Sequence, residues 1–224
     1  MDNSSSFPEA FLEGFRRTGV VATLTIDDAR DAIALALALR DGGVVCLEFT
    51  LRTPCALEAI GLIHREVPEV VVGAGTVLSP AQVEACLEAG AAFGVAPGTN
   101  PRVVAEAQAA GLPFAPGICT PSDIERALEA GCTVMKFFPA EPSGGLPYLR
   151  SIAAPFTHLG VEFIPLGGVD EQNAESYLRE PLILAVGGSW LAPRELVQRR
   201  DWTAITARAR QASDLVKRVR EELS

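Results

Sequence analysis

A repeated unit of strand and helix length constrains this chain more than any other feature of its sequence. Candidate helix starts carry a capping residue followed by proline, and they recur at intervals of 20 to 26 residues. The first side chain of each pair can accept a hydrogen bond from a free backbone N–H group, and proline at the first helical position gives up a donor that would have no partner there. The four pairs are Thr53-Pro54, Ser79-Pro80, Asn100-Pro101 and Thr120-Pro121.

The end of the unit also recurs. A glycine suited to a left-handed helix C-cap is followed each time by an apolar run of strand length. The glycines are Gly42, Gly90, Gly111 and Gly131, and the runs span residues 44–49, 93–96, 114–115 and 133–138. One strand, one helix and two short loops fit the length of the repeat.

Apolar and amphipathic patterns extend the series in both directions. We expect helices at 7–17, 145–153 and 171–179, strands at 19–24, 70–72, 162–166 and 182–186, and a final helix or helix pair at about 193–222. Near-continuous apolar strands are typical of parallel strands buried on both faces. Eight units predict a single α/β domain over residues 1–224, a (β/α)8 TIM barrel with an N-terminal helix and an extra C-terminal helix, rather than an open flavodoxin-like sheet. We expect residues 1–6 to be disordered.

Composition excludes several classes of protein. The net charge is −9 and the pI is near 4.8, and the sequence has no cluster of basic residues of the kind that binds nucleic acid. No stretch approaches the ~18–20 uncharged apolar residues of a membrane span, and the polar first six residues do not resemble a signal peptide. We therefore expect a cytoplasmic protein with no nucleic-acid or membrane partner. A small anionic substrate stays possible, because a site needs only a few local cations.

Cysteine and histidine usage argues against disulfides and metals. The five cysteines are odd in number and show no C-x-x-C spacing, which predicts reduced thiols in the core. The only two histidines, His64 and His158, are far apart in the chain, so a zinc or di-metal site with imidazole ligands is not expected. We expect no metal and no cofactor.

Lys136 is the most unusual residue for its surroundings. It is one of two lysines in the chain and lies inside the apolar run Thr133-Val134-Met135-Lys136-Phe137-Phe138-Pro139, whereas Lys217 lies in a charged C-terminal segment. Burying a charge is costly unless it is paired or neutralised, and a buried lysine, unlike arginine, can lose its proton and become a nucleophile. The alternative is a lysine that reaches solvent from a strand end.

Glu48 is the matching acid. Alternation along the strand that begins at residue 44 places Cys46, Glu48 and Thr50 on one face. The carboxylate could act as a general acid or base, or it could be an edge carboxylate paired with an arginine. Arg52 follows it closely and could bind a substrate carboxylate.

Glycine pairs follow the last two predicted strands, at Leu166-Gly167-Gly168 and Gly187-Gly188-Ser189. Glycines there let backbone N–H groups approach an anion, and TIM barrels frequently bind phosphate in these two loops. Turns need glycine too, so one pair alone would be weak support. Two earlier strands end at Gly75-Thr76 and Ala96-Pro97-Gly98. Since barrel chemistry lies at the carboxyl ends of the strands, these segments are expected to converge.

Together these segments resemble the 2-keto-3-deoxy-6-phosphogluconate (KDPG) aldolases, which also act on 4-hydroxy-2-oxoglutarate (KHG). The resemblance runs from about Val20 to Trp202. Its most specific stretches are Leu47-Glu48-Phe49-Thr50-Leu51-Arg52-Thr53, Val72-Gly73-Ala74-Gly75-Thr76-Val77-Leu78, Lys136-Phe137-Phe138-Pro139-Ala140-Glu141 and Gly187-Gly188-Ser189-Trp190-Leu191.

The resemblance implies a role for each site residue. It implies a Schiff-base lysine at Lys136 and a general acid/base at Glu48. It places the substrate-binding residues at Arg52 and Thr76 for the carboxylate, at Pro97 and Phe138 beside the substrate, and at Gly167, Gly168, Gly188 and Ser189 for the phosphate. It also implies a homotrimer.

Two positions depart from the family. The family commonly has Pro-Thr-Gly-Gly where this chain has Pro165-Leu166-Gly167-Gly168, and Ser-Pro-Gly where this chain has Ala96-Pro97-Gly98. Leu166 removes a hydroxyl next to the substrate, so we expect it to affect specificity rather than the reaction.

The chain is therefore predicted to be a metal-independent class I aldolase. It would cleave KDPG, or a related 4-hydroxy-2-keto acid, to pyruvate and an aldehyde such as glyceraldehyde 3-phosphate. Two alternatives stay open: a phosphate-binding barrel isomerase or epimerase without a covalent lysine, and a barrel that binds a metabolite without catalysis.

Overall fold

The structure is a computed structural model and describes residues 7–223. The predicted disordered segment 1–6 lies outside the described residues. Every strand pair is parallel, and the strands are β1 (Val20–Leu24), β2 (Cys46–Thr50), β3 (Val71–Gly75), β4 (Gly94–Val95), β5 (Phe114–Ala115), β6 (Gly117–Ile118), β7 (Val134–Phe137), β8 (Glu162–Pro165) and β9 (Val186–Gly188).

Helices alternate with these strands. The α-helices are α1 (Glu9–Thr18), α2 (Ala32–Asp41), α3 (Ala56–Glu66), α4 (Pro80–Glu88), α5 (Pro101–Ala110), α6 (Pro121–Glu129), α7 (Gly145–Ala153), α8 (Ala174–Leu178), α9 (Arg194–Gln198) and α10 (Trp202–Leu223). Short 3-10 helices are η1 (Ala29–Asp31), η2 (Glu141–Ser143), η3 (Ala154–Leu159) and η4 (Ser189–Leu191). No helix among residues 7–223 has the length and apolar character that crossing a membrane requires.

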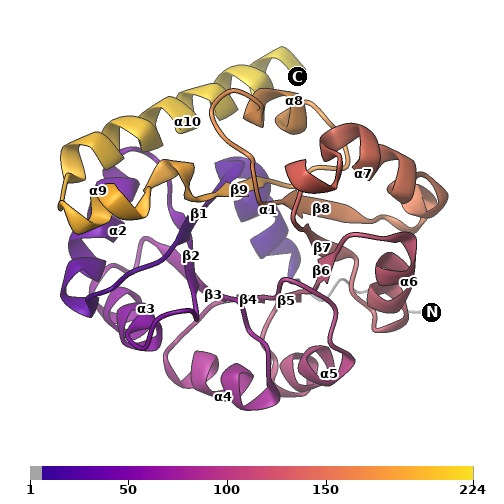
Figure 1. The fold of residues 1–224 in the computed structure, drawn as a ribbon, viewed down its shortest axis with the longest axis horizontal. Coiled ribbons are helices and arrows are strands. Elements are labelled where there is room, and N and C mark those ends of the chain that lie inside the picture. The colour runs from indigo at the N-terminus through magenta and orange to yellow at the C-terminus, as the bar shows by residue number, and fades with distance from the viewer. Residues whose placement is uncertain (1–6, 224) are drawn as a thin grey trace.

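The strands curl into a ring with the helices outside it (Figure 1). The expected single closed sheet is met only in part, because the hydrogen bonding divides into a six-stranded sheet, β5-β4-β3-β2-β1-β9, and a three-stranded sheet, β6-β7-β8. Pro116, which has no N–H group, separates β5 from β6 in the chain. At the other junction only an isolated bridge joins Phe163 of β8 to Ile183.

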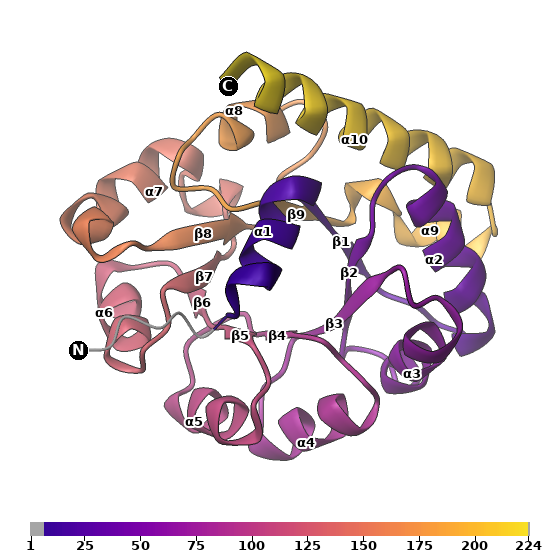
Figure 2. The ribbon, with the colours of Figure 1, turned by 180° about the vertical axis from the view of Figure 1, so that it is seen from behind.

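Two apolar layers hold the ring together. One layer lies between strands and helices and takes side chains such as Leu47 and Phe49 of β2. The other fills the ring from inside and includes Cys46, so the predicted alternation along β2 is confirmed. Figure 2 shows α1 lying across one end of the ring. Its Phe15 reaches the inner layer and makes an edge-to-face contact with Phe93, with 5.4 Å between ring centroids.

Three of the four predicted helix starts are confirmed and one is wrong. Ser79, Asn100 and Thr120 each accept a backbone N–H bond at the start of α4, α5 and α6. Thr53-Pro54 instead lies in a turn, and α3 begins at Ala56 because the Thr53 carbonyl accepts from the Ala56 N–H group.

Two predictions near strand ends also need correction. Gly42 ends α2 in a right-handed conformation, and the left-handed residue is Gly43, with φ 92°. The last strand is residues 186–188 rather than 182–186, so Gly187 and Gly188 lie within a strand. The apolar residues before it bond to β8 instead, since Leu184 N–H donates to the Phe163 carbonyl.

Candidate active site

Lys136 and Glu48 form an ion pair inside the ring of strands. Lys136 Nζ donates to Glu48 Oε1 over 3.0 Å, and the two residues are 5 % and 1 % exposed. They come from β7 and β2, which belong to different sheets. The structure thus brings together the amine and the acid that the sequence singled out, and it excludes both a solvent-reaching Lys136 and an edge carboxylate at position 48.

Gly75 makes room for the carboxylate. A Cβ atom built at Gly75 would lie 2.0 Å from Glu48 Oε1, a distance that no real side chain tolerates. Gly75 ends β3, and its Cα is in register with Thr50 on the neighbouring strand. Glycine at this strand end therefore serves close packing around Glu48.

An aromatic ring lies beside the amine. Lys136 Nζ is 5.5 Å from the centroid of the Phe138 ring, within the range of a cation–π contact. A Cβ atom at Gly167 would lie 3.1 Å from this ring, so the glycine lets the loop after β8 approach it. Phe138 forms a half-buried wall between the lysine and the first of the two glycine-rich loops.

Threonine hydroxyls contact both Glu48 of β2 and Arg52 of the turn that follows it. Thr23 Oγ1 lies 3.4 Å from Glu48 Oε2, so each carboxylate oxygen has one neighbouring donor. Thr50 Oγ1 donates to the Leu24 carbonyl, which leaves it to accept from Arg52 Nε (3.2 Å) and from Thr25. Arg52 Nη2 donates to Thr25 over 2.9 Å. Among residues 7–223, the Arg52 guanidinium is thus oriented by hydroxyls alone.

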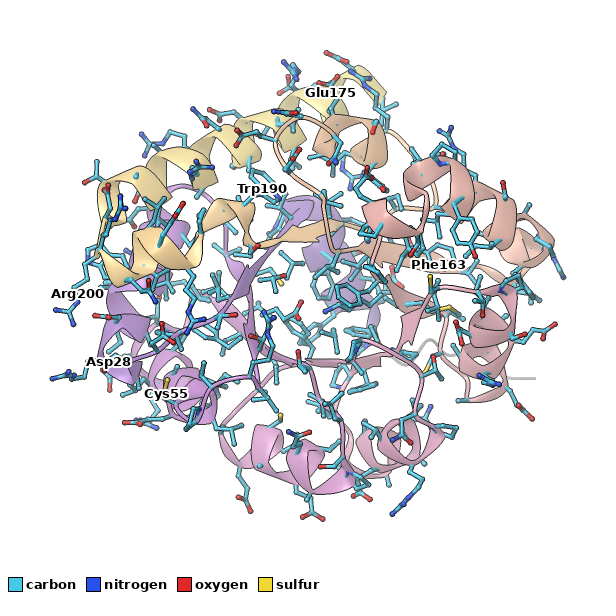
Figure 3. All side chains as sticks on the ribbon, viewed as in Figure 1. Asp28, Cys55, Phe163, Glu175, Trp190 and Arg200 are labelled. Carbon is cyan, nitrogen blue, oxygen red and sulfur yellow. The ribbon has the colours of Figure 1, made fainter. Side chains whose placement is uncertain are left out.

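Above this network a polar cavity of about 340 Å³ opens at the carboxyl ends of the strands. It is lined by hydroxyl side chains, by Ala192 and by two guanidinium groups, and Ser189 contributes from the loop after β9. Thr23 links the cavity to Glu48, since its hydroxyl both lines the cavity and contacts the carboxylate. Figure 3 shows side chains from the surrounding strands crowding the centre of the ring.

The loop after β8 has the geometry of an anion cradle. Gly167 and Gly168 have φ values of 91° and 86°, which L side chains rarely adopt. Within residues 7–223 their N–H groups make no hydrogen bond, while the Gly168 carbonyl accepts from Asn173. Gly188 differs, because its φ of −177° is ordinary extended backbone.

Three further predicted residues, Thr76, Pro97 and Leu166, follow the ends of β3, β4 and β8. Thr76 has a positive φ of 61°, an uncommon conformation for threonine that clusters at functional sites. Pro97 packs on the backbone of Gly117, the residue whose Cα is in register with Lys136. Leu166 is buried, and its side chain fills the space where Gly187 would carry a Cβ atom.

Other reactive groups near the site are unsuited to the same chemistry. Burial raises the pKa of the Cys46 thiol, and the neighbouring Glu48 carboxylate raises it further. Since the thiolate is the nucleophilic form, Cys46 stays inert. All five cysteines are free, but only Cys46, Cys86 and Cys132 are buried, so the prediction of core thiols holds for three of them. In the described part of the chain, no three His, Cys, Asp or Glu side chains gather as a metal site would require.

The sequence analysis did not single out two threonines at the carboxyl end of β1. Thr23 lies in β1 and Thr25 directly follows it, and they alternate with apolar residues, so they face the same side as Glu48 and Thr50 of the adjacent strand. Two hydroxyls at this spacing were a usable signal, because a strand face that is polar at its carboxyl end points toward a barrel site.

Comparison with known proteins gives one consistent result. The family model described as KDPG and KHG aldolase matches residues 12–208. A 2-dehydro-3-deoxy-phosphogluconate aldolase from Treponema pallidum is 43 % identical over 204 residues, which cover 91 % of this chain and 96 % of the relative.

Two solved structures are similar along most of their length. The KDPG aldolase of Legionella pneumophila, with pyruvate captured at low pH as a covalent carbinolamine intermediate, has a TM-score of 0.85 and 37 % identity, covering 88 % of this chain and 95 % of its own. The 2-keto-3-deoxy-6-phosphogluconate aldolase of Zymomonas mobilis ZM4, with 3-phosphoglycerate, has a TM-score of 0.84 and 43 % identity, covering 90 % of this chain and 94 % of its own.

Proposed function

This chain belongs to the KDPG and KHG aldolase family, and from that premise we propose that it cleaves a phosphorylated 4-hydroxy-2-keto acid to pyruvate and an aldehyde through an imine on Lys136. The observation that carries the proposal is the buried contact between Lys136 Nζ and Glu48 Oε1. A nucleophilic amine and a proton acceptor within hydrogen-bond reach are what a Schiff-base mechanism requires.

Lys136 acts as the nucleophile. The ammonium first passes a proton to Glu48, and the free amine then attacks the C2 carbonyl of the substrate to give a carbinolamine. Loss of water forms an iminium ion, which draws electrons from the C3–C4 bond as that bond breaks. The electron pair stays on the pyruvyl fragment as an enamine. The Phe138 ring, whose centroid is 5.5 Å from Lys136 Nζ, supports this assignment, because it offers an apolar wall to the developing methyl group.

Glu48 moves the protons. It supplies one when water leaves the carbinolamine, takes one from the C4 hydroxyl as the aldehyde forms, and returns one to C3 of the enamine. Water then hydrolyses the pyruvyl iminium and frees the lysine. Thr23 supports this role, since its hydroxyl approaches the oxygen that does not contact Lys136.

Anion contacts hold the two ends of the substrate. Arg52, oriented by Thr25 and Thr50, takes the keto-acid carboxylate together with Thr76. The N–H groups of Gly167 and Gly168, which make no hydrogen bond within residues 7–223, take the phosphate together with Gly188 and Ser189. Pro97, which follows β4, lies beside the substrate as the family resemblance implies.

The two rival functions are less well supported. A barrel isomerase or epimerase would use the same glycine loops but has no need of a buried lysine held 3.0 Å from a carboxylate. A binding protein without catalysis would have no reason to bear the cost of burying that pair, which a hydrophobic pair of similar volume would avoid.

Three further features are proposed together with this function. The chain folds as one domain, a closed (β/α)8 barrel, which the bridge from β8 to Ile183 and the continuity of β5 with β6 support. The family resemblance supports a homotrimer, with a mass near three times the 23.7 kDa of one chain. Five free cysteines support a reducing compartment such as the cytoplasm.

The proposed function is tested by product release and trapping. KDPG and KHG are supplied in turn, and pyruvate is followed with lactate dehydrogenase and NADH. Borohydride is then added with and without pyruvate. Pyruvate release and inactivation only when borohydride and pyruvate are both present support the proposal. Pyruvate release that resists borohydride, or no release from either substrate, contradicts it.

A further inference from the structure

The cavity at the mouth of the site is lined by two arginines and, among residues 7–223, by no acidic side chain. Arg52 and Arg194 both line it, together with the hydroxyl residues Thr23, Thr25, Thr53 and Ser189. Arg52 belongs to the turn after β2, whereas Arg194 is the first residue of α9. A cavity lined by guanidinium groups from two elements, together with hydroxyls, favours a ligand with two anionic groups.

Arg194 is held in place by residues on its outer side. Its Nε and Nη2 donate to the two carboxylate oxygens of Asp27, over 3.0 Å and 2.5 Å, and Gln198 Nε2 donates to the same carboxylate over 2.9 Å. Arg194 holds the pKa of Asp27 below its ordinary value, so the carboxylate stays ionised. The bidentate contact fixes the plane of the guanidinium even though its side chain is 56 % exposed.

Donors of Arg194 stay available to a ligand. A guanidinium has five N–H groups, of which Asp27 takes two. Within residues 7–223 no other acceptor receives a bond from Arg194, although the side chain lines the cavity. The Asp27–Arg194 pair is neutral as a whole, so attraction for an anion comes from these directed N–H groups rather than from excess charge.

We propose that Arg194 is a specificity-determining residue that binds the distal anionic group of the substrate, at the end remote from the keto acid. The proposal rests on the proposed function, because it adds a side-chain contact at the same end of the substrate that the glycine-rich loops hold. A planar carboxylate and a tetrahedral phosphate each offer two oxygens that accept a pair of N–H bonds from one guanidinium, so either group fits Arg194. Ser189 lines the same cavity and adds a hydroxyl donor.

Arg200 provides a matched control. Its side chain is 58 % exposed and forms an ion pair with Asp31, with 2.8 Å between Nε and Oδ1, so it is also an exposed arginine paired with an aspartate of the segment after β1. Arg200 does not line the cavity. Figure 3 places it at the outer edge of the ring beside Asp28, pointing away from the centre. Arg194→Gln and Arg200→Gln therefore remove the same charge and a similar surface ion pair.

The test measures binding without turnover. Calorimetry gives the Kd of 3-phosphoglycerate, which carries a carboxylate and a phosphate at opposite ends, and the Kd of pyruvate, which has only the keto-acid end. In Arg194→Gln we expect the Kd of 3-phosphoglycerate to rise about tenfold or more relative to that of pyruvate, the loss expected for hydrogen bonds to a charged group. Arg200→Gln should leave both Kd values within about twofold, as exposed ion pairs contribute little.

A second arm identifies the distal group. The fall in kcat/KM of Arg194→Gln is compared on KDPG, which ends in phosphate, and on KHG, which ends in carboxylate. A fall in kcat/KM on either substrate supports the proposal, and the substrate that shows the fall identifies the distal group. The proposal is overturned if the Kd of 3-phosphoglycerate rises less than about threefold in Arg194→Gln. It is also overturned if Arg200→Gln raises that Kd as much as Arg194→Gln does, or if Arg194→Gln raises the Kd of pyruvate as much. Failure of the proposed function is distinguishable, because it would remove borohydride trapping while leaving the binding comparison intact.

Discussion

Lys136 Nζ and Glu48 Oε1 lie 3.0 Å apart in the interior of the ring, on strands from two different sheets. The two charges depend on each other, because either partner alone would be a costly buried charge. The pair combines two properties that a Schiff-base aldolase needs: an amine shielded from water and a group that can take its proton. Substitutions that remove one property of the pair at a time separate its chemical role from its structural one.

The first prediction concerns the site of the covalent adduct. Borohydride with pyruvate should add one reduced pyruvyl group to Lys136 and none to Lys217, which is exposed and pairs with Asp214 on α10. Lys136→Arg should abolish turnover and keep the fold, because a guanidinium is neither deprotonated nor nucleophilic. Peptide mass mapping and circular dichroism check both parts. Lys217→Arg is the matched control, and an adduct at Lys217 would refute the assignment.

The second prediction concerns the proton carrier. Glu48→Gln keeps the size of the side chain and loses its basicity, so kcat should fall ~10²–10⁴-fold. Glu162→Gln is a suitable control, because Glu162 is also a strand glutamate paired with a cation, Arg16, but is the first residue of β8 and does not line the cavity at the carboxyl ends of the strands. Steady-state kinetics on both variants measure the fall in kcat. A Glu48→Gln enzyme within about threefold of wild type would leave the carboxylate a purely structural role.

The third prediction concerns stability. Lys136→Met leaves the buried Glu48 carboxylate without its cation, so the free energy of unfolding should fall by ~3–5 kcal/mol. The double variant Lys136→Met/Glu48→Gln removes both charges and should be more stable than Lys136→Met. Urea unfolding at neutral pH measures the difference. If the two variants unfold at the same urea concentration, the pair is not coupled in the way that its 3.0 Å contact implies.

Much of this arrangement followed from local patterns in the sequence. Repeated caps and apolar runs were enough for the parallel strands, and the rule that barrel chemistry lies at strand ends was enough to expect Lys136 and Glu48 to meet. The contact between Thr23 and Glu48 was missed because it depends on the register of β1 against β2, which pairs these residues side by side. Alternation within a strand predicts the face on which a side chain lies, whereas the residue beside it on the neighbouring strand depends on how two segments far apart in the chain are aligned.

The misplaced elements have similar causes. Residues 182–184 are as apolar as a strand, but they face β8 through an isolated bridge, and pairing with β1 starts only at Val186. The division at Pro116 arises because proline cannot donate to the ladder, so the segment pairs with β4 before it and with β7 after it. Both outcomes depend on which neighbour a segment finds in space.

The fourth prediction concerns metal ions. The proposed iminium on Lys136 serves as the electron sink, so a Lewis acid has no step to assist. Prolonged dialysis against a chelator should leave kcat unchanged, whereas the contrary result, loss of activity that zinc or magnesium restores, would contradict the mechanism. Borohydride trapping on the chelated enzyme serves as a second readout, and the adduct at Lys136 should form at the same rate as before.

The last prediction concerns Leu166, where the family commonly has threonine. Leu166 is buried at the end of β8, and a Cβ atom at Gly187 would lie 2.6 Å from its Cγ, so the side chain forms a close apolar wall against β9. A site that hydrogen-bonds a substrate hydroxyl can reject the wrong analogue by ~10⁴-fold or more, whereas an apolar wall discriminates far less. We therefore expect weak discrimination between KDPG and its galacto epimer, or a preference for KHG.

Leu166→Thr and Leu166→Val separate the hydroxyl from the change of shape. The two replacements have nearly the same volume and leave a similar space beside Gly187, so any loss of packing should be shared. Only threonine restores a donor, and only threonine should raise the ratio of kcat/KM between the two phosphorylated epimers. Steady-state kinetics on both epimers and on KHG measure this. A wild-type preference for the gluco epimer above ~10³-fold, a gap near 4 kcal/mol, would show that Leu166 does not relax specificity. Equal epimer ratios in the threonine and valine variants would show that the hydroxyl has no part in it.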